Sequence, residues 1–221
     1  MCDYVQDRPD GHQFVSRLTG ETTTVRVRRK LVDATYLQSA VPATYIPKFK
    51  IEDGAELATP NELVRLPAGG SGYTIIGAGK TSMDTCSWLL DNDVPPEAIR
   101  WIRPRDPWTL DRASWQPRSQ LPRFVEGFSR LVEAAAQAED LEDLFRRLET
   151  SGEFVRLDPQ VAPQTFRGAT LGAGERDRLR QIDDVVRLGR VRRLASDQIV
   201  LDDGTIPTDG GQIHVDSPLP A

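Results

Sequence analysis

A short glycine-containing segment in the first half of the chain has the residue types needed to bind a phosphate group. It comprises Gly77, Ala78, Gly79, Lys80, Thr81 and Ser82, and it directly follows the β-prone run at residues 73–76. A glycine at the end of a strand permits a tight turn, and a second glycine lets a pyrophosphate approach the main chain. If a helix starts there, its free N–H groups and its dipole bind the phosphate oxygens. We therefore predict that these six residues bind the pyrophosphate of a dinucleotide.

The neighbouring sequence predicts the elements that would position this turn. Met83, Cys86 and Leu90 recur at helical spacing after the glycines. Pro95 stops that helix, and a second short strand follows at residues 99–102. A strand, a glycine turn, a helix and a strand in this order predict a βαβ unit with a parallel sheet.

The glycine pattern alone is a weak signal, and other interpretations of it stay open. The turn could be a purely structural link between a strand and a helix. Gly79, Lys80 and Thr81 also match the end of a P-loop. However, Thr74 occupies the position where a P-loop has its first glycine, which argues against an ATPase or GTPase.

The end of the second predicted strand indicates which dinucleotide is bound. Arg103 and Arg105 lie where the residue that contacts the cofactor ribose is expected. Guanidinium groups pair well with phosphate, so these arginines suit the 2′-phosphate of NADP and favour it over NAD, which remains possible. Asp106 is a competing candidate, as an acid that would bind the ribose of NAD. Both arginines could also be solvated or form surface salt bridges.

Outside this region the sequence predicts strands near both ends and a long amphipathic stretch between them. Residues 13–32 have a hairpin pattern with a turn at residues 19–21, and residues 185–216 contain strand-like runs with a hairpin turn at Asp203 and Gly204. Residues 124–148 carry apolar stripes at helical spacing, which we attribute to packing and not to cofactor binding.

Three segments together resemble one known family. Residues 32–35 (Val-Asp-Ala-Thr), with Pro42 and Pro47 after them, resemble the crossing from the flavin domain to the nicotinamide domain in two-dinucleotide-binding flavoproteins. Residues 75–84 resemble the NAD(P) fingerprint of that family, and residues 199–216 resemble its return crossing. The chain is similar to the middle part of FAD- and NAD(P)-dependent oxidoreductases, the group that includes flavin monooxygenases.

This resemblance implies an α/β fold with a Rossmann-like, three-layer NAD(P)-binding domain at residues 46–211. Residues 1–45 would form strands and a crossing from a partial, truncated flavin domain, and residues 212–221 a truncated return crossing. In the complete protein, NADPH would pass hydride to FAD. The sequence departs from the family at Tyr36 and at Ser217 and Pro218, where steps that contain glycine are expected.

The flavin-binding half that such a protein needs is not evident in the sequence. No strand–GxGxxG–helix unit precedes Tyr73, so we expect a fragment or a diverged stand-alone domain that does not hold FAD tightly. The sequence has no CxxC pair and no recognisable set of acid, base and nucleophile, so the catalytic residues stay unidentified. We expect the chain alone to be inactive. The alternative is a stand-alone dinucleotide-binding or interaction module without turnover.

Composition excludes several other classes of function. The 221 residues include 33 acidic and 28 basic side chains, and the net charge of −5 argues against a general nucleic-acid binder. The sequence has neither a signal peptide nor the run of about 18 apolar residues that a membrane span requires. Cys2 and Cys86 lie far apart and only two histidines occur, so we expect no metal site. These features predict a cytoplasmic protein.

Overall fold

The computed structural model describes residues 2–5, 12–30, 32, 46–66, 70–116 and 118–217. The chain divides into two compact units, residues 1–39 and residues 40–221. The crossing expected at residues 33–45 and the departure expected at Pro218 lie outside the described residues.

The first unit contains an antiparallel sheet of three strands. Their order is β1 (Cys2–Val5), β2 (His12–Ser16) and β3 (Thr22–Val25). Gly20 lies in the turn between β2 and β3 with a φ of +73°, a conformation that glycine adopts without steric cost. The antiparallel pairing of β2 and β3 confirms the predicted hairpin, but its second strand ends at Val25 and does not continue to residue 32.

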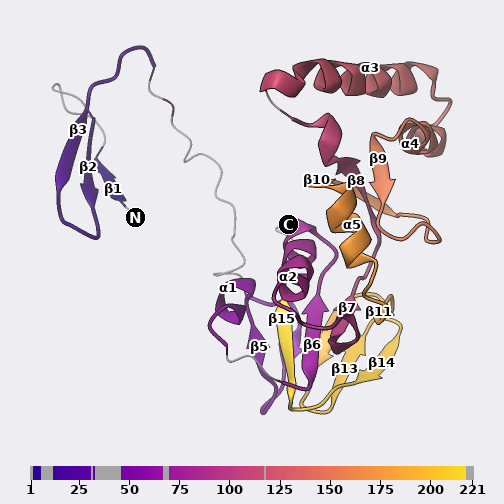
Figure 1. Ribbon diagram of the computed structural model, residues 1–221. Coiled ribbons are helices and arrows are strands. Elements are labelled where there is room, and N and C mark those ends of the chain that lie inside the picture. The colour runs from indigo at the N-terminus through magenta and orange to yellow at the C-terminus, as the bar shows by residue number, and fades with distance from the viewer. Residues whose placement is uncertain are drawn as a thin grey trace. The chain divides into compact units, whose positions relative to one another are not determined.

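The second unit is built around a parallel sheet of five strands (Figure 1). In spatial order these are β11 (Val185–Val186), β7 (Ile99–Ile102), β6 (Gly72–Ile76), β15 (Gln212–Asp216) and β5 (Leu57–Ala58). The chain passes from β6 through helix α2 (Lys80–Asp91) to β7, and β6 pairs in parallel with β7. The predicted βαβ unit and parallel sheet are therefore confirmed.

Successive side chains of a strand point to opposite faces of the sheet, so the apolar residues form two cores, one on each face. Ile75 and Trp101 pack with Met83 and Leu89 of α2 in the first core. In the second core, Ile76 and the neighbouring Ile102 pack against a second, mixed sheet. That sheet contains β12 (Val191–Leu194), β13 (Gln198–Leu201) and β14 (Gly204–Pro207), together with β4 (Lys50–Ile51), which is parallel to β12. The pairing of β13 with β14 confirms the hairpin predicted at Asp203 and Gly204.

Residues 107–171, which we call the α3–α4 region, form a part with its own core. They contain β8 (Pro107–Asp111), α3 (Leu121–Gln137), α4 (Leu141–Thr150), β9 (Phe154–Arg156) and β10 (Thr165–Leu171), with strand order β10-β8-β9. The amphipathic stretch predicted at residues 124–148 is two helices and not one. Asp140 separates them, because its side chain accepts the Asp143 N–H (2.8 Å) and caps α4.

The last described strand lies inside the parallel sheet. β15 pairs with β6 along its whole length, from Gln212 opposite Gly72 to Asp216 opposite Ile76. The segment expected to be a return crossing thus forms a central strand, and the boundary expected after residue 211 falls immediately before it.

Short helices complete the second unit. Within the described residues these include α1 (Pro60–Leu63), α5 (Ala173–Leu179) and 3₁₀ turns at Pro96–Ala98, Arg112–Ser114 and Arg118–Gln120. Within the described part of the chain, no helix combines the length and the apolar character needed to cross a membrane.

Candidate functional site

The candidate site lies at the carboxyl ends of the adjacent strands β6 and β15. From β6 the chain runs through α2 to β7 on one side, while β15 lies on the other side. In open α/β sheets, such a change of direction leaves a crevice outside the carboxyl ends of the strands, and ligands bind there. The glycine turn follows β6 directly and Ser217 follows β15, so the sheet brings both segments to this edge.

Gly77 occupies a position that no other residue type would fit. Its φ of +129° lies in a region that favours glycine, and a Cβ built there would lie 2.7 Å from the carbonyl oxygen of Ser217. Both polar groups of Gly77 bind β7. Its N–H donates to the carbonyl oxygen of Ile102 (2.9 Å), and its carbonyl oxygen accepts the Trp101 Nε1–H (2.8 Å). The turn is therefore tied to β15 by close packing and to β7 by hydrogen bonds.

The start of α2 offers unpaired hydrogen-bond donors beside this turn. Gly79 is the N-cap residue and contributes no side-chain cap. Met83 N–H bonds the Gly79 carbonyl oxygen (3.1 Å), but no acceptor among the described residues pairs with the N–H groups of Lys80, Thr81 or Ser82. Such donors, together with the positive end of the helix dipole, attract an anion. The buried Ser82 hydroxyl stabilises the turn, because it donates a hydrogen bond to the Gly79 carbonyl oxygen (2.7 Å).

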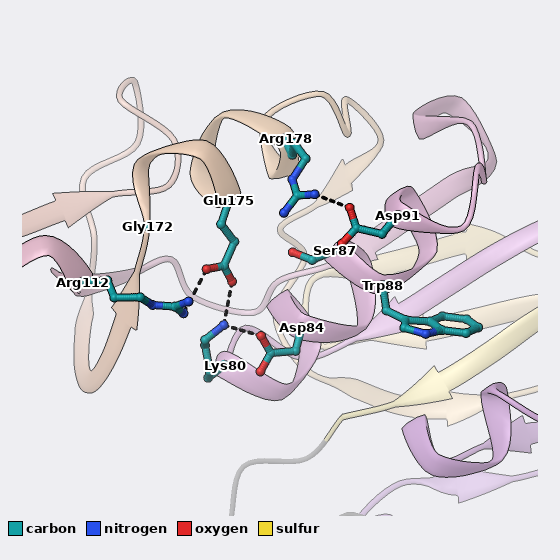
Figure 2. Close-up of a pocket in the computed structure, with 9 residues that line it drawn as sticks. All are labelled: Lys80, Asp84, Ser87, Trp88, Asp91, Arg112, Gly172, Glu175 and Arg178. Atoms are coloured by element: carbon teal, nitrogen blue, oxygen red, sulfur yellow. Dashed lines mark hydrogen bonds and ion pairs between the residues drawn. The ribbon is translucent and has the colours of Figure 1, made fainter. Parts of the chain in front are cut away.

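Lys80 is held by carboxylates in a shallow depression between α2 and α5 (Figure 2). Its Nζ forms ion pairs with Asp84 and with Glu175 (2.6 Å to the latter), and Glu175 also pairs with Arg112 (3.0 Å). The lining side chains carry three positive and three negative charges, contributed by Lys80, Arg112, Arg178, Asp84, Asp91 and Glu175. The Lys80 charge is thus compensated within the protein.

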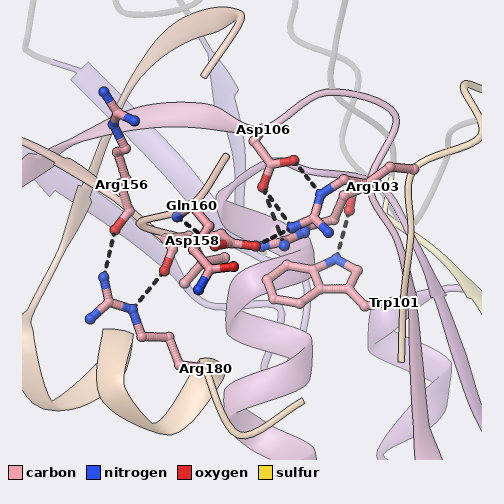
Figure 3. Close-up of polar contacts among 10 residues, drawn as sticks. Trp101, Arg103, Asp106, Arg156, Asp158, Gln160 and Arg180 are labelled. Carbon is pink, nitrogen blue, oxygen red and sulfur yellow. Dashed lines mark hydrogen bonds and ion pairs between the residues drawn. The ribbon is translucent and has the colours of Figure 1, made fainter. Parts of the chain in front are cut away.

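The two arginines predicted to bind the 2′-phosphate have different environments. Arg103 is only 3% exposed, lies 4.8 Å from the centroid of the Trp101 ring and pairs with Asp106 (3.2 Å). Burial lowers the pKa of Arg103. Asp106 also accepts the Arg187 Nε–H (2.8 Å), so the competing ribose-binding acid is itself tied to two arginines (Figure 3). Arg105 is exposed at the surface. The structure therefore separates the predicted pair.

Two polar residues at the end of β15 were not among the predicted site residues. Asp216 is 8% exposed, and burial raises its pKa to about 6. Ser217 is fully buried; its N–H donates to the Ile76 carbonyl oxygen (2.9 Å), but its hydroxyl has no partner among the described residues. A buried polar group without a partner is costly. In the sequence these residues are only a polar pair after Val215, and it is the position of β15 next to β6 that brings them to the candidate site.

Comparison with known proteins finds relatives in mycobacteria. The chain is similar to uncharacterized protein Rv2000 of Mycobacterium tuberculosis strain H37Rv and to uncharacterized protein Mb2023 of Mycobacterium bovis. It is 42% identical to each over 200 residues, which cover 90% of this chain and 37% of the relative. The chain therefore spans little more than a third of the length of the curated relatives it matches. No protein-family model matches the chain, and no solved structure matches it.

Proposed function

We propose that residues 46–216 form a Rossmann-like domain that binds NADP at the carboxyl ends of β6 and β15. In the complete protein, this segment would present the nicotinamide cofactor to a bound flavin, as in FAD-dependent oxidoreductases. NADPH, when bound, supplies a hydride, and the residues of this chain bind and orient it.

The proposal rests on three features that occur together at one edge of the sheet. The glycine turn, the first N–H groups of α2, which no described residue accepts, and the change of direction of the parallel sheet all occur at the same edge. Each of these features is common alone, but together they are the requirements for binding a pyrophosphate at the start of a helix. The turn therefore fits the cofactor as a set of main-chain donors, with the side chain of Lys80 engaged elsewhere.

The 2′-phosphate is assigned to Arg105, because its side chain is exposed. The guanidinium of Arg103 is buried and paired with Asp106, so a phosphate would have to displace an internal ion pair to reach it. A charge-assisted hydrogen bond contributes about 1.5–3 kcal/mol. Arg105→Ala should therefore weaken NADPH binding by roughly tenfold to a hundredfold and leave NADH binding nearly unchanged.

Gly79→Val tests the position of the pyrophosphate. The φ of Gly79 is −93°, which valine also adopts, so the change mainly adds a side chain where the phosphate must approach. We expect the affinity for NADPH, measured by isothermal titration calorimetry, to fall at least tenfold, with the melting temperature as a check on folding.

Gly210→Val is the matched control for this experiment. Gly210 precedes the amino end of β15, is not among the glycines with positive φ and has no atom within 4 Å of an added Cβ. It should bind NADPH as the wild type does. Wild-type affinity in Gly79→Val would show that the pyrophosphate binds elsewhere.

The role of flavin is tested by the absorbance spectrum of the purified chain. The chain has one dinucleotide turn, assigned to NADP, so we expect no bound FAD. A flavin band together with NADPH oxidation would instead assign Gly77 and Gly79 to FAD.

A further inference from the structure

A tryptophan side chain forms a hydrogen bond with the main chain of the glycine turn. Trp101 is fully buried in β7, and its indole N–H donates to the carbonyl oxygen of Gly77 (2.8 Å). The N–H of Gly77 donates to the Ile102 carbonyl oxygen (2.9 Å), so the backbone is held on both sides of this residue. The first of these hydrogen bonds comes from a side chain, so a substitution can remove it.

The hydrogen bond from Trp101 determines where the next N–H points. In a trans peptide the carbonyl oxygen and the following N–H lie in one plane and point in opposite directions. When the indole holds the Gly77 oxygen, the N–H of Ala78 must point away from the indole. Because glycine tolerates many backbone angles, the peptide between Gly77 and Ala78 could rotate if the indole did not hold it.

The indole is held in place by a buried charge. The guanidinium of Arg103 lies 4.8 Å from the Trp101 ring centroid, within the range of a cation–π interaction. Arg103 is held by Asp106 (3.2 Å), and Asp106 is held by Arg187 (2.8 Å). Figure 3 shows Trp101, Arg103 and Asp106 together, and these contacts connect the ends of β7 and β11 to the glycine turn through Trp101.

We propose that Trp101 is a positioning residue for the diphosphate of the cofactor. It orients the peptide between Gly77 and Ala78 so that the Ala78 N–H faces the diphosphate, and Arg103 keeps the indole in place. This inference rests on the proposed function. It predicts that both residues affect NADPH and NADH equally, because the two cofactors share the diphosphate and differ only at the 2′ position.

Trp101→Phe tests the proposal, because phenylalanine keeps an aromatic ring under Arg103 but lacks the N–H. Losing one neutral hydrogen bond corresponds to a change of about threefold to tenfold in affinity. We expect NADPH and NADH to weaken by the same factor within this range. In ¹⁵N NMR spectra, the shift of the Ala78 amide on adding NADPH should be lost, while the amides of Lys80, Thr81 and Ser82 still respond.

Trp108→Phe is the matched control. Trp108 lies in the α3–α4 region, its ring stacks on Phe145, and its buried indole N–H has no partner among the described residues. This substitution removes an N–H of the same kind away from the turn, so affinity for both cofactors should stay at the wild-type value.

A second variant keeps the proposal testable if Trp101→Phe does not fold. Arg103→Ala should weaken NADPH and NADH by equal factors, whereas Arg105→Ala should weaken NADPH alone. Wild-type affinity and an unchanged Ala78 response in Trp101→Phe would overturn the positioning role, as would a loss confined to NADPH in Arg103→Ala. A wild-type chain that binds neither cofactor would overturn the proposed function itself, and the positioning role with it.

Discussion

The helix beside the glycine turn and the helices of the α3–α4 region use their apolar residues differently. In α2, Met83, Cys86 and Leu89 are completely buried against the parallel sheet. In α3, the buried residues are small, Gly127 and Ala134. Four of its larger apolar side chains are more than half exposed: Leu121, Val125, Phe128 and Val132.

This difference shows that an apolar stripe does not by itself identify a core. Residues of α3 at spacings of three and four form two neighbouring stripes, and its own core covers one of them. On the α2 side of the sheet, Met83, Cys86 and Leu89 are completely buried, and at its edge no described residue accepts the first N–H groups of α2. The first arrangement favours contact with another apolar surface, and the second favours an anion.

The largest effect should come from truncating the same residue type in the two helices. Leu89 is fully buried in α2, and Leu121 is 55% exposed in α3. Leu89→Ala should lower the free energy of unfolding by about 2–5 kcal/mol, because it leaves a cavity in a packed core. Leu121→Ala should change it by less than about 0.5 kcal/mol. Urea denaturation measures both values, and equal losses would show that the stripe of α3 is covered in solution.

The carboxyl end of β15 should make the stability of the second unit depend on pH. Burial raises the pKa of Asp216 from 3.8 to about 6, so the folded state favours the protonated carboxyl. Stability is therefore greatest below about pH 4 as far as this group is concerned, falls as pH rises through about 6, and is then constant. At pH 7, ionisation of Asp216 lowers the free energy of unfolding by up to about 3 kcal/mol.

Asp216→Asn removes this ionisation. The variant should be more stable than the wild type at pH 7, and the difference should shrink as the pH is lowered from 7 to 4. Urea denaturation at a series of pH values measures it. A constant difference between the two proteins over that range would contradict the assignment of the titration to Asp216.

A smaller effect is expected at the glycine of α3 that faces the region's own core. A Cβ on Gly127 would lie 2.8 Å from Oε2 of Glu153, a carboxylate that is 1% exposed and pairs with Arg130 (2.7 Å). Overpacking lowers the free energy of unfolding by about 1–3 kcal/mol, and the better helix propensity of alanine raises it by about 1 kcal/mol. Gly127→Ala should thus destabilise the protein by about 1 kcal/mol in thermal or urea unfolding.

Gly174→Ala is the matched control, since Gly174 lies in helix α5 with no atom within 4 Å of an added Cβ. It should stabilise the protein by about 0.5–1 kcal/mol, because alanine has the higher helix propensity. A stabilising Gly127→Ala would show that Glu153 moves aside without cost.

Local patterns were enough to predict much of the fold around the candidate site. The β-prone residues before Gly77, the helical spacing of Met83 and Cys86 after it, and the hairpin turn at Gly204 each depend on neighbours in the sequence. Backbone conformation and side-chain periodicity are short-range properties, so a single sequence contains them. The strands of the α3–α4 region lack such a pattern: β9 has only three residues, and its pairing with β8 spans more than 40 positions.

The sequence by itself determined that a glycine turn stands between a strand and a helix, and that two arginines follow the next strand. Only the tertiary structure decided that Arg103 is buried over Trp101 while Arg105 is exposed, that Trp101 binds the turn, and that Asp216 arrives beside it on β15. The physical reason is that burial and charge pairing depend on which distant segments meet. Thr74 and Gln212, for example, form a hydrogen bond of 3.0 Å although they lie 138 positions apart in the sequence. The local sequence pattern around either residue does not indicate this contact.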